Sequence, residues 1–246
     1  MVDLKGKKAL ITGASRGIGR AIALELAACG AEIFLHYANN TGKAKETLSE
    51  ISNLSVPCRL IQADLNDPAQ TKACFSKTGG VDILVLNAST QIKNEWDKIT
   101  EDEFSKQVNC NFLSSLLLLQ QYIPYMQKQR FGRVVTIGSV QETKPHPQML
   151  VYAATKAAQT SMAMSLAMQL APYAITVNNV APGTIYTDRN KQALHDPAYA
   201  KKVMDSIPLH FFGEPKDIAA TVRLLCSDEG RYITGQSIYI DGGKSL

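Results

Sequence analysis

The 246-residue chain is poor in cysteine, carries little net charge and has no long hydrophobic run. Its five cysteines include no CxxC pair, which argues against a disulfide framework and a cysteine-ligated metal, so no metal site is predicted. The longest apolar stretch, FLSSLLLLQQYIPYM, is broken by serines and glutamines and is too short to cross a bilayer. These absences exclude a disulfide-rich secreted domain and an integral membrane protein.

The chain also has no large excess of positive or negative charge. The 26 basic and 22 acidic side chains give a net charge of +4 without a basic block, which is too weak to indicate a nucleic-acid partner. The N-terminal stretch MVDLKGKKALITG turns glycine-rich after a short apolar run and does not have the pattern of a secretory signal. We therefore expect a cytoplasmic protein with neither a membrane nor a nucleic-acid partner.

Short β-rich runs alternate with helical patterns from end to end. Strands are predicted at 8–13, 32–37, 58–64, 81–88, 133–139, 175–183 and 236–243, and helices near 17–29, 41–53, 67–77, 101–128, 152–171 and 215–226. Most strand runs are apolar on both faces, as in parallel strands covered by helices on both sides. The pattern predicts an α/β fold, a single-domain Rossmann fold over 1–246 with a doubly wound parallel sheet of about seven strands. The polar, irregular segment 186–212 is predicted to be a substrate lid.

Polar or turn-forming residues close five of the predicted strands. They are Gly13, Asp64, Asn87, Ser139 and Pro182. In doubly wound sheets, ligands bind at the carboxyl ends of the strands, near the point where the strand order reverses. The sequence therefore predicts one site that collects these five positions.

The stretch TGASRGIG, residues 12–19, follows the first predicted strand and opens the first helix. Gly13 allows a tight turn, Gly17 lets the backbone approach a pyrophosphate, and Gly19 lets helix and strand pack closely. Free N–H groups at a helix N-terminus bind phosphate well. This loop is predicted to bind a dinucleotide, with Ser15, Arg16 and Ile18 as further contacts.

The TGxxxGxG spacing, together with YAATK at 152–156, resembles the classical short-chain dehydrogenases/reductases. The resemblance covers essentially the whole chain, and it is similar overall to 3-oxoacyl-[acyl-carrier-protein] reductases and to sugar or polyol dehydrogenases. It implies a nicotinamide cofactor, oxidoreductase activity and a homotetramer paired through the helices near 101–128 and 152–171. The sequence itself supports only apolar helix faces that suit an oligomer.

The second predicted strand indicates which form of the cofactor is bound. NAD-binding proteins usually carry an acidic residue at the end of this strand to hold the ribose hydroxyls. Here the strand ends in His36 and Tyr37, and Arg16 supplies a cation suited to a 2′-phosphate. Asn39 or Asn40 could add hydrogen bonds. NADP(H) rather than NAD(H) is therefore predicted, with Tyr37 and Asn39 among its contacts.

The resemblance implies further cofactor contacts along the chain. Asp64 and Leu65 would flank the adenine, and Asn87 and Ala88 would lie against the ribose. The nicotinamide end would meet Pro182, Gly183, the backbone of Ile185 and the hydroxyl of Thr187. The chain departs from the family where Ser89 follows Asn87-Ala88, a position that is usually glycine. Because serine has a Cβ, the backbone there must avoid glycine-only conformations.

The predicted catalytic set is Ser139, Tyr152 and Lys156, with a fourth member at Asn111. Tyr152 and Lys156 share one helical face. A phenol with a pKa of about 10 is a poor base at neutral pH, so the lysine and an oxidised nicotinamide are expected to lower that pKa. Ser139 would hold the substrate oxygen, and Lys156 would also hold the cofactor ribose. In the family pattern, the asparagine of a proton relay lies seven residues after an aromatic residue and thirteen before a proline. Phe104 and Pro124 therefore select Asn111, and Asn109 is the alternative.

Three functions are compatible with these motifs. The first is an NADP(H)-dependent oxidoreductase acting on a carbonyl or secondary alcohol of a small ketone, sugar or polyol. Met168 and Tyr173 stand where acyl-carrier reductases usually present arginines, so a 3-oxoacyl-[acyl-carrier-protein] reductase is the alternative. A non-catalytic nucleotide sensor is more remote, because it would not need the serine, tyrosine and lysine. In the loop after Ser139, Gln141 is predicted to contact substrate, and Glu142 and His146 either contact hydroxyls or face solvent.

Overall fold

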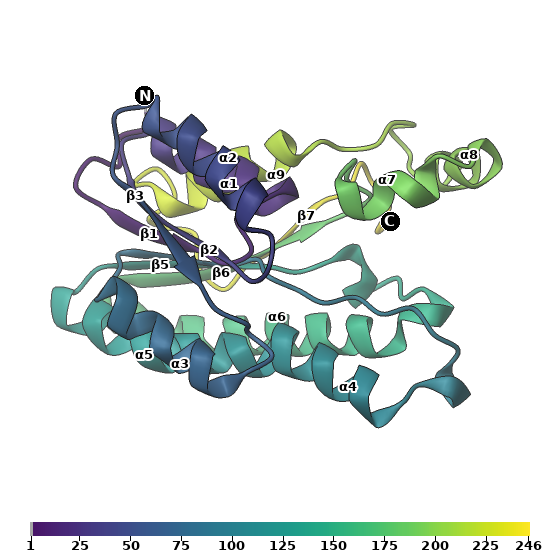
Figure 1. The fold of residues 1–246 in the computed structure, drawn as a ribbon, viewed down its shortest axis with the longest axis horizontal. Coiled ribbons are helices and arrows are strands. Elements are labelled where there is room, and N and C mark those ends of the chain that lie inside the picture. Colours follow the sequence, from purple (N-terminus) through teal and green to yellow (C-terminus); the bar gives the residue numbers. More distant parts are fainter. Residues whose placement is uncertain (1) are drawn as a thin grey trace.

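Seven parallel strands lie in one sheet in the computed structural model, which describes residues 2–246 (Figure 1). Their order is β3-β2-β1-β4-β5-β6-β7. The strands are β1 Lys8–Ile11, β2 Glu32–Tyr37, β3 Cys58–Gln62, β4 Ile83–Leu86, β5 Gly132–Ile137, β6 Ile175–Pro182 and β7 Ser237–Ile240. Each falls within a predicted strand or extends it by one residue at its start, and the predicted doubly wound α/β sheet is confirmed. The order reverses between β1 and β4, so the carboxyl ends of these two strands flank the expected ligand crevice.

Helices cover both faces of the sheet (Figure 1). One layer holds α1 Gly17–Ala28, α2 Thr41–Ser52 and α9 Pro215–Cys226, and the other holds α3 Pro68–Thr78, α4 Glu101–Val108, α5 Ser114–Gln129 and α6 Leu150–Leu170. Side chains of each strand alternate between two cores. On β1, Ala9 and Ile11 join the core under α1, whereas Leu10 joins the core against α5 and α6. This alternation of apolar residues on both faces explains why the strands read as continuous hydrophobic runs.

The helix predicted over 101–128 is interrupted in the structure. A π-helical turn, Asn109–Leu113, separates α4 from α5. The Ser114 hydroxyl donates to the Cys110 carbonyl at 2.6 Å, and the Ser115 hydroxyl donates to the Asn111 carbonyl at 3.1 Å. Serine hydroxyls that bond back to the preceding turn bend helices. The interruption places Asn111 at the bend, facing the carboxyl end of β4.

The segment 186–212 is helical rather than irregular. It contains α7 Asp188–Leu194 and α8 Pro197–Asp205, which extend beyond the carboxyl ends of the strands (Figure 1). The α8 start follows a common rule, because Asp196 accepts from the Ala198 N–H at 3.0 Å and Pro197 occupies the first helical position. Among residues 2–246, no helix combines the length and the apolar character needed to cross a bilayer.

Candidate active site at the carboxyl ends of the strands

A cavity of about 1040 Å³ opens at the carboxyl ends of β1, β2, β4, β5 and β6. It runs from the glycine loop to α7 and α8, and every residue predicted above to bind the cofactor lines it. Ser139 and Gln141 line it too, whereas Asn111 is fully buried behind its wall. The fold therefore gathers the sequence-predicted positions into one continuous space, large enough for a dinucleotide and a small second molecule.

The glycine loop presents unused N–H groups to this cavity. Gly13 has a φ of +65°, and its N–H donates to His36 Nδ1 at 3.1 Å. The Ala14 N–H donates to the His36 carbonyl at 2.8 Å. Along the described chain, the N–H groups of the next four residues, 15–18, find no acceptor. A pyrophosphate would supply the missing acceptors, so the loop fits the predicted cofactor.

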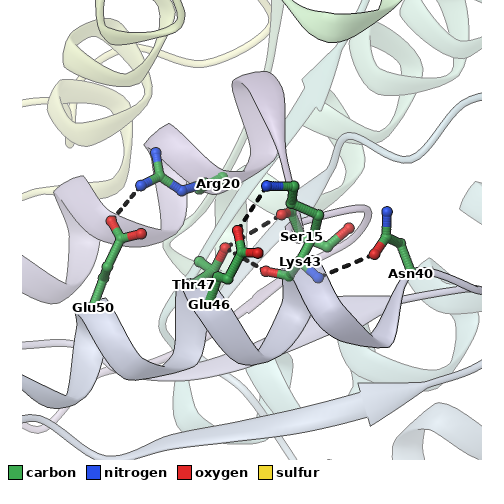
Figure 2. A network of polar contacts seen from close by, with 7 residues as sticks. All are labelled: Ser15, Arg20, Asn40, Lys43, Glu46, Thr47 and Glu50. Carbon is green, nitrogen blue, oxygen red and sulfur yellow. Dashed lines mark hydrogen bonds and ion pairs between the residues drawn. The ribbon is translucent and has the colours of Figure 1, made fainter.

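Contacts from α2 hold this loop from behind (Figure 2). The Thr47 hydroxyl donates to the Ser15 carbonyl at 3.3 Å, and Asn40 caps α2 by accepting from the Lys43 N–H at 3.0 Å. Lys43 also pairs with Glu46 at 2.7 Å, and Arg20 pairs with Glu50. The side-chain oxygen of Asn40 is thus occupied as a helix cap. Of the two predicted asparagines, Asn39 is therefore the one favoured as a cofactor contact.

Arg16 differs from its neighbouring cations. It is exposed at the N-terminus of α1, and within residues 2–246 it has no carboxylate within 4.0 Å. The end of β2 offers no competing acid, because it reads His36-Tyr37. A free guanidinium on the rim of the adenosine end suits a 2′-phosphate and has no equivalent function toward a ribose hydroxyl.

His36 has a role that the sequence did not reveal. Its ring is buried, with Nδ1 accepting from Gly13 and Nε2 lying 3.1 Å from the Ala63 carbonyl. The ring thus joins the ends of β1, β2 and β3 as a neutral imidazole with its proton on Nε2. Burial lowers the pKa of His36 to about 4. The one signal in the sequence is a histidine inside an apolar strand next to the glycine loop.

This burial makes folding stability depend on pH. The unfolded chain takes up a proton on His36 below about pH 6.5, whereas the folded chain does so only near pH 4, so stability is lost as pH falls through that window. Relative to a His36→Asn variant, whose Oδ1 can still accept from Gly13, the wild type should lose about 2 kcal/mol between pH 7.5 and 5. Denaturant unfolding of both proteins measures this difference. A constant difference across the range would contradict a neutral buried ring.

Asn87 joins the two strands at which the order reverses. Its side-chain N–H group donates to the carbonyls of Thr12 at 2.8 Å and Gly13 at 3.1 Å. The backbone N–H groups of Asn87 and Ala88 donate in return to the Thr12 hydroxyl, at 2.8 and 3.0 Å. Asn87 therefore holds β4 against the glycine loop. Ser89, the departure from glycine, has a backbone outside the left-handed region, as its Cβ requires.

The chain after β6 lies opposite the glycine loop. Pro182 ends β6, and a β-bridge joins Ile185 to Gly213. A Cβ built on Gly17 would lie 3.5 Å from the Thr187 methyl carbon, so the loop after β6 faces the glycine loop directly. Gly17 and Thr187 thus lie close together and both line the cavity.

Ser139, Tyr152 and Lys156 converge at the centre of the cavity. The Ser139 N–H donates to Glu142 Oε1 at 2.8 Å, and its hydroxyl accepts from the Gln141 N–H at 3.2 Å, which holds the serine at the end of β5. The Tyr152 hydroxyl lies beside Ser139. Lys156 Nζ donates to the Ile137 carbonyl at 2.7 Å and lies 5.9 Å from the centre of the Tyr152 ring.

The charges around Tyr152 differ from the expectation. Burial raises the pKa of Tyr152, and the cation that opposes this rise most is Arg189 of α7, not Lys156. Lys156 is itself fully buried, and its burial lowers its pKa to about 8. A lysine that is buried and bonded to a carbonyl is a weaker partner for a phenolate than the sequence pattern suggests.

Asn111 does not line the cavity. Its side-chain oxygen accepts from the Thr90 N–H at 2.7 Å, and its side-chain N–H group donates to the Thr90 carbonyl at 2.9 Å and to Thr155 Oγ1 at 3.0 Å. It fixes the chain after β4 against α6, one turn from Tyr152. In the loop after Ser139, Glu142 also points away from the cavity, toward Asn179 at 3.3 Å, whereas Gln141 and His146 line it.

Arg189 is the site residue that sequence reasoning missed. It stands in the first turn of α7 and lines the cavity next to Tyr152. One guanidinium nitrogen donates to Ser89 Oγ at 3.1 Å and the other donates to the Ser89 carbonyl at 2.8 Å. In the sequence, the only indication of a role for Arg189 was its position two residues after Thr187. Its contact with Ser89 joins residues 100 positions apart.

Comparison with known proteins gives a consistent result. A family described as Enoyl-(Acyl carrier protein) reductase matches residues 13–245. The chain is 39% identical over 244 residues to the 3-oxoacyl-[acyl-carrier-protein] reductase FabG of Staphylococcus aureus, with 98% of each chain covered. The 3-oxoacyl (acyl-carrier-protein) reductase of Agrobacterium tumefaciens C58 with NADP bound has a TM-score of 0.94 at 32% identity, covering 98% of this chain and 95% of that one. A blue fluorescent protein from a metagenomic library, in complex with NADPH, has a TM-score of 0.91 at 34% identity, covering 99% and 100%.

Proposed function

Because the chain belongs to the short-chain dehydrogenase/reductase family, we propose that it reduces the carbonyl group of a small ketone, sugar or polyol-derived substrate. As a member of this family it is an oxidoreductase, and its cofactor is NADP(H). The observation that carries the proposal is the convergence of Ser139, Tyr152 and Lys156 beside a loop with unused N–H groups, in one cavity.

Bound NADPH supplies the hydride. The Tyr152 hydroxyl donates its proton to the carbonyl oxygen, and the Ser139 hydroxyl donates a hydrogen bond that holds this oxygen in place. Burial raises the pKa of Tyr152, so its hydroxyl carries the proton that reduction requires. Lys156 holds the ribose next to the substrate, and its pKa of about 8 lets it pass a proton toward Tyr152. We keep Asn111 rather than Asn109 as the fourth member of the set, since its hydrogen bond to Thr155 Oγ1 holds α6 one turn from Tyr152.

We assign the cofactor contacts as the sequence predicted them. The phosphates meet residues 13–19, Arg16 meets the 2′-phosphate with Tyr37 and Asn39 nearby, and Asp64 and Leu65 flank the adenine. The ribose and nicotinamide meet Asn87, Ala88, Pro182, Gly183, Ile185 and Thr187. All of these positions line the cavity, which supports the assignment.

Several surface features favour a free metabolite over a carrier-bound one. Met168 is 83% exposed, and Tyr173 is also exposed, at the end of α6. Arg133 is buried, with its guanidinium 3.7 Å from Asp228 and donating to the Gly132 carbonyl at 3.0 Å, so it cannot meet an acidic carrier. Arg130 is exposed near this end, and it donates to the Pro172 carbonyl at 2.9 Å.

The second candidate is a 3-oxoacyl-[acyl-carrier-protein] reductase. The relative at 39% identity carries that name, and the chain matches it over 98% of its length. Under this alternative the small-molecule cavity would hold a pantetheine-linked acyl chain, and the exposed methionine at position 168 would take part in carrier docking.

We also propose that residues 1–246 act as one domain, with 186–212 as the substrate lid, in a cytoplasmic homotetramer. Leu116 on α5 and Met164 and Met168 on α6 are exposed apolar side chains on the helix layer that the family pairs between subunits. Such unpartnered faces suit contact with a second copy of the chain. All five cysteines are free thiols, which suits a reducing compartment.

The proposal is tested by NADPH oxidation against a panel of ketoses, small diketones and a 3-oxoacyl thioester. We expect a sugar or small ketone to have the highest kcat/KM. Highest turnover of the thioester would establish the second candidate instead. Tight NADPH binding without turnover of any panel member would favour a nucleotide sensor.

A further inference from the structure

Four cations line the substrate end of the cavity without an acidic partner. They are Lys93, Arg189, Lys202 and Lys244, and in the described part of the chain none has a carboxylate within 4.0 Å. Neighbouring cations outside the cavity can be paired, as Lys201 is with Asp205 at 2.7 Å. Cations that face one cavity and lack partners attract an anion.

The acids at this end do not neutralise the cluster. Glu95 lines the cavity, and its carboxylate, which accepts from the Gln148 side chain at 2.7 Å, offsets one of the four positive charges. Asp188 lies at the start of α7, where its charge faces Lys43 on the cofactor side. The substrate end therefore has an excess of positive charge.

Arg189 is the cation nearest to the reacting atoms. Ser89 orients its guanidinium through the two hydrogen bonds at 3.1 and 2.8 Å. The same guanidinium also lies within hydrogen-bonding reach of the Tyr152 hydroxyl, and its charge opposes the rise in the pKa of Tyr152. A planar guanidinium fork beside the proton donor suits a planar oxyanion on the substrate.

The three lysines lie farther out, around His146. Their positive charges act on this ring, and Lys244 Nζ donates to the Thr184 hydroxyl at 3.0 Å. Lys93 comes from the chain after β4, Lys202 from α8 and Lys244 from the C-terminal segment. Three separate parts of the fold therefore contribute to this group of positive charges. Such an arrangement steers an anion toward the mouth of the cavity.

We propose that the substrate is an oxo acid. It carries a carboxylate or phosphate group a few bonds away from the reacting carbonyl, and Arg189 binds this group. The inference rests on the proposed carbonyl reduction and narrows its substrate class. The cofactor does not account for Arg189, because its pyrophosphate is met by the free N–H groups of residues 15–18 and its 2′-phosphate by Arg16. Ser89 serves as a positioning residue for the guanidinium.

The test compares ketones that differ in charge. We would measure kcat/KM with NADPH for acetoacetate against methyl acetoacetate, and for 5-keto-d-gluconate against l-sorbose, in the wild type, Arg189→Gln and Ser89→Ala. The wild type should prefer the acid of at least one pair by about 10- to 100-fold, the effect of one charge-assisted hydrogen-bond pair. The preference should vanish in Arg189→Gln and weaken in Ser89→Ala. The Kd for NADPH should stay within about twofold, because Arg189 lies outside the phosphate contacts.

Binding without turnover provides an independent measurement. Calorimetric titration of the enzyme–NADP⁺ complex with oxamate and with neutral oxamide should show binding of oxamate only, lost in Arg189→Gln. The steering by outer lysines is tested by Lys202→Gln, which should remove part of the salt dependence of kcat/KM for the acid. Lys201→Gln, which replaces the neighbouring paired lysine outside the cavity, is the matched control and should not.

The outcomes separate this inference from the proposed function. Equal reduction of acids and neutral ketones, with no oxamate binding, would overturn the oxo-acid inference and leave carbonyl reduction standing. Binding of oxamate that depends on Arg189, without reduction of any ketone, would support the anion site and overturn the proposed function. Weaker NADPH binding in Arg189→Gln with an unchanged acid preference would assign Arg189 to the cofactor and overturn the inference.

Discussion

Replacement of Tyr152 by phenylalanine should lower kcat by about a thousandfold or more while the Kd for NADPH changes little. The substitution removes one oxygen atom, the hydroxyl that lies beside Ser139 in the cavity. General acid catalysis contributes about 10²- to 10⁴-fold, and loss of the orienting hydrogen bond to the substrate oxygen adds to it. The phenyl ring should still fit, because Tyr152 is 6% exposed and phenylalanine keeps the same ring.

Steady-state kinetics with the best ketone of the panel and titration of NADPH fluorescence measure the two quantities. Tyr173→Phe is the matched control, since Tyr173 is partly exposed outside the cavity, and its kcat should equal that of the wild type. A Tyr152→Phe variant with near-normal kcat would refute the assignment of the proton donor. A parallel loss of NADPH binding would indicate that the change had disturbed the cofactor site instead.

Replacement of Gly19 by alanine should weaken NADPH binding by at least about tenfold and lower the free energy of unfolding by about 3 kcal/mol. The added Cβ would lie 2.4 Å from the Gly13 carbonyl oxygen and 2.5 Å from the Asn87 side-chain nitrogen. Neither atom can yield easily. Asn87 holds Thr12 and Gly13 through two hydrogen bonds, and Gly13 is bonded to the His36 ring. Relief of the clash would therefore move the whole phosphate-binding loop.

Gly42→Ala is the control for this variant. Gly42 lies in α2, and a Cβ there would meet only Asn40 Oδ1, at 3.8 Å. Alanine favours a helix interior over glycine by roughly 1 kcal/mol, so this variant should be as stable as the wild type or slightly more stable. Thermal or denaturant unfolding and NADPH titration compare the pair. A Gly19→Ala variant that unfolds and binds NADPH like Gly42→Ala would show that the loop tolerates a Cβ.

The sheet and its crevice could be predicted because they rest on local patterns. Apolar runs on both strand faces, glycines at a strand-to-helix turn and polar residues at strand ends all recur within short windows of sequence. Even so, one cue of this kind was overlooked. The pair Asp196-Pro197 is a regular helix start, and it sets the first residue of α8 in a segment expected to be irregular.

The remaining features depend on contacts that no local pattern contains. The π-helical turn at Asn111 arises from serine hydroxyls that compete for carbonyls of the preceding turn. The charge that acts on Tyr152 comes from Arg189, which approaches only because α7 folds back over the cavity. The buried state of His36 likewise depends on two neighbouring strands. Sequence position therefore predicted which residues would meet, but not which cation would lie beside which hydroxyl.

The Ser89–Arg189 contact has a consequence for how such a site could diversify. Glycine at position 89 would still offer its carbonyl but would lose the hydroxyl that accepts one of the two guanidinium hydrogen bonds. Serine without the arginine would in turn leave a polar group with nothing to orient. Arg189 therefore keeps one of its two hydrogen bonds whatever residue stands at position 89, whereas only a side chain with an acceptor supplies the second. The two positions set the orientation of the guanidinium together, although a hundred residues separate them.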